Sequence, residues 1–209
     1  MKFKKSVSGY SRKAAAYADE EISQSAMEEV FFQLSNKHHI EGWTYEYLKS
    51  ISLNALLASL GIDDDNKYKD YKFDGGIIIL RNNSNPKQIK IVLTCEDKSQ
   101  QAKANAIERL ANQLWVLRTY TDSSILPEVV FFSGNATKFD ENGNIENSTI
   151  RGTIKGFISP SLKISENGHI SKDRWNMIYL KEGRFTKEEK VNILLEAANK
   201  SISYWKAVV

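Results

Sequence analysis

Two carboxylates are brought together by a predicted β-hairpin in the first half of the chain. Residues 75–80 and 89–95 are rich in β-branched side chains, and the Asn-Asn-Ser-Asn-Pro cluster at 82–86 has the composition of a turn. Asp74 precedes the first run and Glu96 follows the second. Antiparallel pairing of the two runs therefore predicts that the two carboxylates lie side by side.

Lys98 adds an ammonium group to this pair. Side chains alternate along an extended strand, so Glu96 and Lys98 are expected to face one side and Asp97 the other. Mg²⁺ is commonly held by one or two carboxylates together with a substrate phosphate, and it converts a bound water into a nucleophile. An ammonium beside it can orient that water or offset transition-state charge. The pattern suits phosphodiester hydrolysis; because it is short, a solvated strand end is the alternative interpretation.

The apolar pattern that follows predicts a helix over residues 102–120 with one buried stripe. The stripe consists of Ile107, Leu110, Leu114 and Leu117. The opposite face carries Asn105, Glu108, Arg109 and Asn112. Because Asn and Arg make bidentate contacts with adenine and guanine edges, this face suits the recognition of DNA bases. Ordinary solvation of a polar helix face is the alternative.

Three segments in this order resemble the type II restriction endonucleases of the EcoRI family, which belong to the PD-(D/E)xK nucleases. The segments are Asp-Gly-Gly-Ile at 74–77, Val-Leu-Thr-Cys-Glu-Asp-Lys-Ser-Gln at 92–100, and Asn-Ala-Ile-Glu-Arg at 105–109. The segment Pro-Glu-Val-Val-Phe-Phe-Ser-Gly-Asn at 127–135 is similar to the apolar strand and Gly-x-Asn turn that follow the same helix in the family.

The resemblance implies a role for each matching residue. Asp74 and Glu96 would bind Mg²⁺, and Lys98 would position the attacking water, which makes these three the catalytic residues. The residues implied in DNA binding are Gln100, Asn105, Ala106, Glu108 and Arg109. The resemblance also implies a homodimer that cuts double-stranded DNA at a short palindrome with an AATT core, leaving 5′-phosphates on 5′ overhangs. A cognate DNA methyltransferase that protects the host site is implied in the same way.

Composition is that of a soluble globular protein. With 209 residues, 41% hydrophobic and 26% charged, the chain fits one domain, 1–209. A net charge of +3 is too slight to indicate nucleic-acid binding. The first 18 residues, however, carry five basic side chains and no acid, which suits either a phosphate-contacting arm or a solvated terminus.

The single cysteine and the hydropathy favour a cytoplasmic protein without a membrane segment. Cys95 excludes an internal disulfide and fits a reducing compartment. Its place in an apolar strand favours a buried filler over a nucleophile. No apolar stretch approaches the roughly 20 residues that cross a bilayer.

The remaining pattern predicts an α/β fold in which a central mixed β-sheet is flanked by helices, as in restriction endonucleases. Helices are expected at 19–34 and, between Thr44 as N-cap and Gly61 as C-cap, at 44–60. A last helix begins at Thr186, whose spacing to Glu189 makes a capping box. Strands are expected at 129–132 and 175–180.

Two further features leave alternatives open. Glu28, on the first helix, is the candidate for an additional glutamate near the metal, and a solvated helix face is the alternative. Residues 134–172 carry hairpin-type turns and positive charge. They suit a β-rich flap along the DNA backbone or at a dimer contact, or an inert surface meander.

The favoured function is a Mg²⁺-dependent, sequence-specific DNA endonuclease. A repair or homing nuclease of the same superfamily would use the same metal chemistry with a different choice of target. A non-catalytic DNA-binding protein is the alternative from another class. A converging carboxylate pair repels phosphate when no metal is bound, which favours an enzyme.

Overall fold

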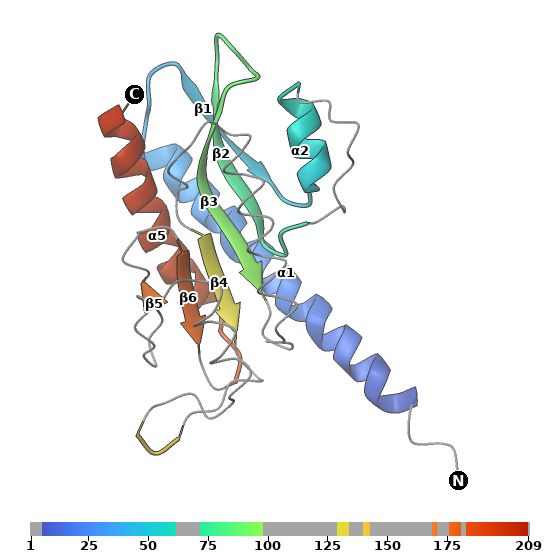
Figure 1. Cartoon of the computed structure of the whole chain (residues 1–209). Helices are drawn as coiled ribbons and strands as arrows, with labels where there is room; N and C mark the ends of the chain where they lie inside the picture. Colours follow the sequence, from blue (N-terminus) through green and yellow to red (C-terminus); the bar gives the residue numbers. More distant parts are fainter. Residues whose placement is uncertain are drawn as a thin grey trace.

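The computed structural model describes residues 6–61, 72–97, 129–133, 140–142, 169–170, 176–180 and 183–208. Within these ranges the chain forms a six-stranded mixed sheet with the order β1-β2-β3-β4-β6-β5 (Figure 1). The strands are β1 (Trp43–Leu48), β2 (Gly76–Asn82), β3 (Ile89–Asp97), β4 (Val129–Ser133), β5 (His169–Ile170) and β6 (Asn176–Leu180). The helices are α1 (Ser6–Lys37), α2 (Leu53–Ser59) and α5 (Lys187–Val208). The prediction of a mixed sheet combined with helices is confirmed.

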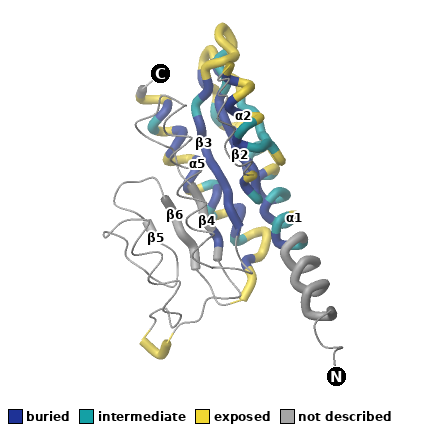
Figure 2. The backbone as a smooth tube through the Cα atoms, turned by 45° about the vertical axis from the view of Figure 1, so that its right-hand side comes forward, coloured by how far each residue is buried: buried dark blue, intermediate teal, exposed yellow. Residues whose placement is uncertain are grey.

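The sheet consists of an antiparallel and a parallel half that meet at β3. β1 pairs with β2, and β2 with β3, in antiparallel fashion. β3, β4 and β6 run parallel, and the short β5 lies antiparallel to β6. The predicted strands at 129–132 and 175–180 are confirmed as β4 and β6. β3 is thus a central strand, buried along almost its whole length (Figure 2).

The predicted β2–β3 hairpin is confirmed, including its turn. The Asn82 side-chain oxygen accepts hydrogen bonds from the backbone N–H groups of Ser84 and Asn85, both at 2.9 Å. Such bonds from an asparagine to the following backbone stabilise turns, which is why this polar cluster reverses the chain.

A β-bulge in β3 decides which face of the sheet its last residues use. Ile78 pairs with Leu93 but Ile79 pairs with Ile91, so Val92 is an extra residue on β3. Val92 and Leu93, although adjacent, both belong to the core beneath the helices. From there the ordinary alternation of a strand places Cys95 and Asp97 on the helix side and Thr94 and Glu96 on the other.

α1 and α5 pack against each other and cover one face of the sheet. Their buried residues form one hydrophobic core with the sheet residues Ile78, Leu80, Val92, Leu93, Cys95 and Phe132. The helices contribute Ala26, Met27, Val30, Leu34, Val191, Leu194, Ala197, Ala198, Ile202 and Trp205. The Trp205 indole N–H donates to the Ile91 carbonyl at 2.8 Å, which ties the C-terminal end of α5 to β3.

α5 begins with the predicted capping box. The Thr186 backbone N–H donates to the Glu189 carboxylate at 2.8 Å, and the Glu189 N–H donates to the Thr186 hydroxyl at 3.2 Å.

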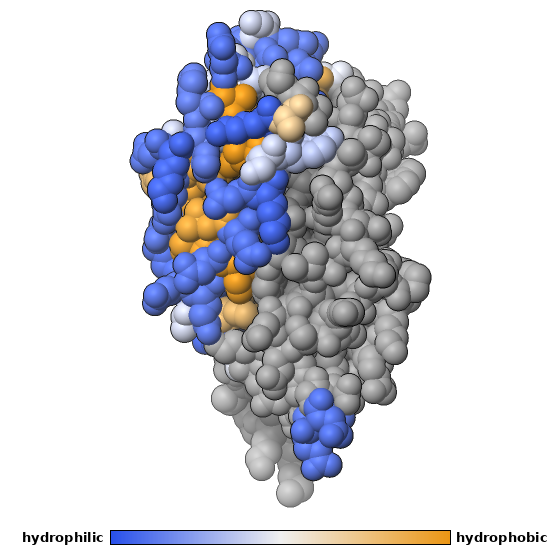
Figure 3. Space-filling view, turned by 90° about the vertical axis from the view of Figure 1, so that its left-hand side faces the viewer, coloured by the Kyte–Doolittle hydropathy of each residue, from blue (hydrophilic) through white to orange (hydrophobic). Residues whose placement is uncertain are grey.

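On the side of the molecule that includes α5, hydrophilic residues cover most of the described surface and hydrophobic ones form only a narrow strip between them (Figure 3). Among the described residues, Phe32 is the one large hydrophobic side chain that is exposed, at 56%. The apolar stripe of α5 is therefore core.

The helix predicted over 44–60 is wrong in its first half. Residues 43–48 form strand β1, because their aromatic and β-branched side chains can pair along β2. The helix starts only at Leu53, with Ser52 rather than Thr44 as its N-cap; the Ser52 hydroxyl accepts from the Ala55 N–H at 3.1 Å. Its end lies one residue earlier than predicted, because Leu60 rather than Gly61 is the C-cap. Gly61 follows the cap with a φ of 76°, and its N–H donates to the Ala58 carbonyl.

The first helix is longer than its apolar periodicity suggests. α1 begins at Ser6 rather than at residue 19, and its N-terminal turns project beyond the sheet (Figure 1). An alanine run at 14–16 favours this extension, because alanine has the highest intrinsic helix propensity. No helix in the described part of the chain is both long enough and apolar enough to cross a bilayer.

Two glycines let the chain enter β2 directly after Asp74. A Cβ atom on Gly75 would lie 2.5 Å from the Cys95 sulfur, so only glycine permits this close approach to β3. Gly76 has a φ of 85°, and a Cβ there would lie 2.7 Å from the Leu48 carbonyl oxygen. The Gly-Gly pair after Asp74 is therefore required by the local backbone.

Gly76→Ala should be more destabilising than Gly42→Ala. Both glycines have positive φ, but a Cβ on Gly42 meets no atom within 4 Å. Gly42→Ala should lower the free energy of unfolding by roughly 1–2 kcal/mol, from the left-handed backbone alone. Gly76→Ala should lower it by about 1 kcal/mol more, because Leu48 must move. Equal losses in urea unfolding would contradict the close approach at Leu48.

Candidate functional site

Asp74 and Glu96 lie side by side at the open end of the β2–β3 hairpin. They are 22 residues apart in sequence, yet the backbone N–H of Asp74 donates to the Glu96 carboxylate at 3.0 Å. Glu96 is only 2% exposed. It lies near the carboxyl end of β3, beside the parallel strand β4.

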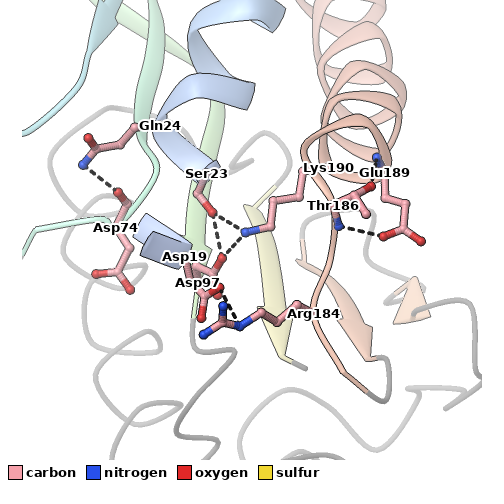
Figure 4. A network of polar contacts seen from close by, with 9 residues as sticks. All are labelled: Asp19, Ser23, Gln24, Asp74, Asp97, Arg184, Thr186, Glu189 and Lys190. Atoms are coloured by element: carbon pink, nitrogen blue, oxygen red, sulfur yellow. Dashed lines mark hydrogen bonds and ion pairs between the residues drawn. The ribbon is translucent and has the colours of Figure 1, made fainter. Parts of the chain in front are cut away.

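The turn at Asp74 is held by α1 and β1. The Gln24 side-chain amide donates to the Asp74 carbonyl at 3.2 Å and to the Glu20 carboxylate at 3.1 Å. The Tyr47 hydroxyl lies 2.9 Å from the Gly75 carbonyl oxygen and donates to it. The Asp74 carboxylate points away from the Gln24 amide (Figure 4). The backbone of the turn is fixed while this side chain extends from it.

A buried polar network holds the end of β3 from the helix side (Figure 4). Asp97 forms an ion pair with Lys190 of α5, and each side chain is only 1% exposed. The Ser23 hydroxyl of α1 donates to the Asp97 carboxylate at 2.7 Å and accepts from the Lys190 ammonium at 2.7 Å. The ammonium also lies 5.3 Å from the centroid of the Phe132 ring. Three segments far apart in sequence thus meet at one pair of opposite charges.

A second buried aspartate, Asp19 of α1, forms an ion pair nearby. Asp19 is 4% exposed and lies 3.4 Å from the Arg184 guanidinium, just before α5. The two buried aspartates of this region, Asp19 and Asp97, are each matched by a basic residue from the segment 184–190. Buried charges are tolerated only when paired, so the two contacts together set how α5 packs on α1 and β3.

The donor set at Asp74 and Glu96 fits a hard divalent cation. Carboxylate oxygens are the ligands that Mg²⁺ prefers, and one or two carboxylates with water and substrate phosphate complete its coordination. No group of three or more His, Cys, Asp or Glu residues suited to a metal occurs in the described part of the chain. That is not a requirement for Mg²⁺, which retains several waters.

Cys95 is a buried structural residue, as its sequence context predicted. It is fully buried between the hairpin and the helices. Burial raises the pKa of the Cys95 thiol above its usual value, so the reactive thiolate is suppressed. Its role is to fill the space against Gly75.

Most of the other predicted site residues lie outside the described residues. These are Lys98, Gln100, Asn105, Ala106, Glu108 and Arg109, together with the predicted helix at 102–120. Most of the predicted flap at 134–172 also lies outside them; β5 and residues 140–142 are its described parts. Glu28 is exposed on α1. The α1 glutamate linked to the Asp74 turn, through Gln24, is Glu20.

The residues that hold the site were not identified from the sequence, although part of the pattern was present. Lys190 precedes Leu194 and Ala198 by four and eight positions, so it belongs to the apolar stripe of α5. Ser23 precedes the α1 core residues Ala26 and Met27 by three and four positions, so it belongs to the buried stripe of α1. A charge within an apolar stripe indicates a buried ion pair, but only the structure identifies Asp97 as its partner.

No known protein-family model matches the chain, and no curated protein is significantly similar to it.

Lys190→Met should destabilise the fold strongly, because it leaves the Asp97 charge buried without its cation. We expect a loss of about 3–5 kcal/mol in the free energy of unfolding. Lys187→Met is the matched control on the same helix. Lys187 pairs with Glu29 at 2.7 Å, but both side chains are more than 40% exposed, at 47% and 43%. Its loss should be about 1 kcal/mol or less. Similar losses in the two variants, measured by denaturant unfolding, would argue against a buried pair.

Tyr47→Phe and Tyr45→Phe should have opposite effects on stability. Tyr47→Phe removes the hydrogen bond to Gly75 and should lower the free energy of unfolding by about 1 kcal/mol. The Tyr45 hydroxyl is buried without a hydrogen-bond partner among the described residues, so its removal should be neutral or stabilising by up to about 1 kcal/mol. Thermal unfolding of both variants provides the measurement. A Tyr45→Phe variant less stable than Tyr47→Phe would contradict the hydrogen bonding described for the two hydroxyls.

Tyr45→Phe should also reduce the loss of stability at alkaline pH. Burial raises the pKa of Tyr45 from 10.0 to about 12. The folded protein therefore retains this proton above pH 10 while the unfolded chain loses it, and the stability present below pH 10 is lost as the pH rises toward 12. Tyr45→Phe should lose less stability than the wild type over this range.

Proposed function

We propose that this protein is a Mg²⁺-dependent, site-specific endonuclease of double-stranded DNA with a restriction-endonuclease-like fold, similar to the EcoRI family. The observation that carries the proposal is the contact between Asp74 and Glu96. Two acidic residues separated by a whole hairpin are joined by a hydrogen bond of 3.0 Å at the end of a central strand. Asp74 of the Asp-Gly-Gly motif and Glu96 of the Glu-x-Lys motif meet at this point.

The position within the sheet supports the same conclusion. In open α/β sheets, ligands bind beyond the carboxyl ends of parallel strands. Glu96 is the penultimate residue of β3 and is paired with Phe131 of the parallel strand β4. The antiparallel hairpin adds Asp74 to this edge. A phosphodiester could approach the two carboxylates here from outside the sheet.

Each residue has a distinct task in the proposed reaction. Asp74 and Glu96 hold Mg²⁺, which supplies Lewis acidity and an acidified water when bound. Lys98 orients the attacking water and offsets charge at the scissile phosphate. The backbone N–H of Asp74 fixes the orientation of the Glu96 carboxylate before DNA binds. Hydrolysis leaves a 5′-phosphate and a 3′-hydroxyl.

Target selection is assigned to the segment after β3. Gln100, Asn105, Ala106, Glu108 and Arg109 match the DNA-contacting positions of the EcoRI family, which suggests a target with an AATT core. A homodimer would place one site on each strand, because two-fold protein symmetry matches a palindrome. In a host cell, a cognate methyltransferase would protect the same sequence.

Plasmid cleavage tests the proposal directly. Purified protein is incubated with a plasmid of known sequence in Mg²⁺ or EDTA, and the fragment ends are sequenced. We expect discrete Mg²⁺-dependent fragments that share one palindrome. Asp74→Asn, Glu96→Gln and Lys98→Ala should each lower the cleavage rate at least about 100-fold, because each removes several kcal/mol of transition-state stabilisation. Glu196→Gln, at an exposed glutamate of α5, is the matched control and should cut at the wild-type rate.

Other outcomes identify the alternatives. Cleavage confined to damaged sites or free ends would indicate a repair nuclease that uses the same residues. Tight DNA binding without cleavage in Mg²⁺ would indicate a non-catalytic DNA-binding protein. Cleavage that survives the Asp74 and Glu96 substitutions would refute the site.

A further inference from the structure

We propose that the buried Asp97–Lys190 ion pair, together with Ser23, is a positioning device for Glu96, and that it sets the geometry of the metal-binding carboxylates. This inference rests on the proposed function. Its members contact one another on the helix side of the sheet, opposite the Glu96 side chain. They act through the backbone of the last two residues of β3.

Glu96 and Asp97 are coupled through the backbone. Asp97 directly follows Glu96, and a trans peptide keeps consecutive Cα atoms 3.8 Å apart. The two side chains emerge on opposite faces of the sheet. Asp97 is held from the helix side by Ser23 and Lys190, while Glu96 is held from the Asp74 backbone N–H. A shift of Asp97 along or across the strand therefore moves Glu96 by a similar amount.

One helix, α1, holds both halves of the site. Ser23 donates to Asp97, and its neighbour Gln24 donates to the Asp74 carbonyl. Adjacent residues of α1 thus fix the end of β3 and the turn before β2. Because a helix is rigid over one residue, α1 sets the separation between the two carboxylate-bearing segments (Figure 4).

Burial limits the stability that the Asp97–Lys190 ion pair can add. Two charges lose their hydration on burial, so apolar side chains of similar volume often give equal or greater stability. Both members here are 1% exposed. Stability alone does not account for an ion pair at this position. What it provides is a directional constraint on a strand end, which an apolar contact would hold less specifically.

The decisive variant removes both charges and keeps the shapes. Asp97→Asn/Lys190→Met leaves an amide that can still hydrogen-bond to Ser23 and a side chain of nearly the same length as lysine. We expect a folded protein with a Tm close to that of the wild type. Mn²⁺, used as a probe of the carboxylate site, should bind about tenfold more weakly. The kcat for plasmid cleavage should fall about tenfold or more, with a KM for DNA that is unchanged.

The matched control is Glu29→Gln/Lys187→Met. This pair also joins α1 to α5, at 2.7 Å, but it is exposed and not connected to β3. Mn²⁺ affinity and kcat should stay within about twofold of the wild type. Amide hydrogen exchange at Glu96 and Asp97 should accelerate in Asp97→Asn/Lys190→Met and not in this control.

A second variant keeps the inference testable if the double substitution fails to fold. Ser23→Ala retains the ion pair and removes one constraint on Asp97. It should weaken Mn²⁺ binding and accelerate exchange at Glu96, by less than the double variant. Wild-type Mn²⁺ affinity together with wild-type exchange in the folded variants would overturn the positioning role.

The two proposals fail in different ways. If the wild type binds Mn²⁺ through Glu96, as judged by Glu96→Gln, but does not cut DNA, the nuclease proposal fails. The positioning role is then decided by the Mn²⁺ affinity of the double variant alone. If the wild type cuts DNA and the double variant cuts equally well, the nuclease proposal stands and the positioning role is refuted. A wild type that neither cuts nor binds Mn²⁺ refutes both.

Discussion

The buried ion pair between Asp97 and Lys190 is the constraint on which the described structure depends. It joins the last residue of the central strand to α5, and Ser23 brings α1 into the same contact. Charges that are 1% exposed cannot exchange their partners for water without a large cost in free energy. The helices can therefore slide along the sheet only by breaking this contact. Hydrophobic packing gives α1 and α5 their affinity for the sheet, but it is not directional; the ion pair fixes where they lie.

The bulge at Val92 is the second determinant, because it decides which acidic residue meets which environment. Without the extra residue, the alternation along β3 would be displaced by one position, and Glu96 rather than Asp97 would face Lys190. The bulge directs Asp97 to the helices and leaves Glu96 beside Asp74. One local irregularity thus separates a structural carboxylate from a candidate metal ligand.

Local patterns predicted what depends on local interactions. The β2–β3 hairpin, the strand at β4 and the capping box at Thr186 follow from turn composition, apolar runs and the three-residue spacing of Thr186 and Glu189. β1 was predicted as part of a helix because its residues fit a helical as well as an extended pattern. Only pairing with β2 decides between the two. Asp97 was expected to point away from Glu96, but its partner could not be found. Lys190 lies 93 residues away, and no periodicity connects residues at that distance.

The dipeptide Glu96-Asp97 illustrates how the environment assigns chemistry to similar groups. The two carboxylates differ by one methylene and occupy adjacent positions, and both residues are at least nine-tenths buried. Asp97 receives an ammonium and a hydroxyl, so its charge is neutralised within the protein. Glu96 accepts a hydrogen bond from the backbone N–H of Asp74, which orients its carboxylate toward the turn before β2. In the proposed site Glu96 binds the metal, and Asp97, whose cation is Lys190, holds the end of β3 in place.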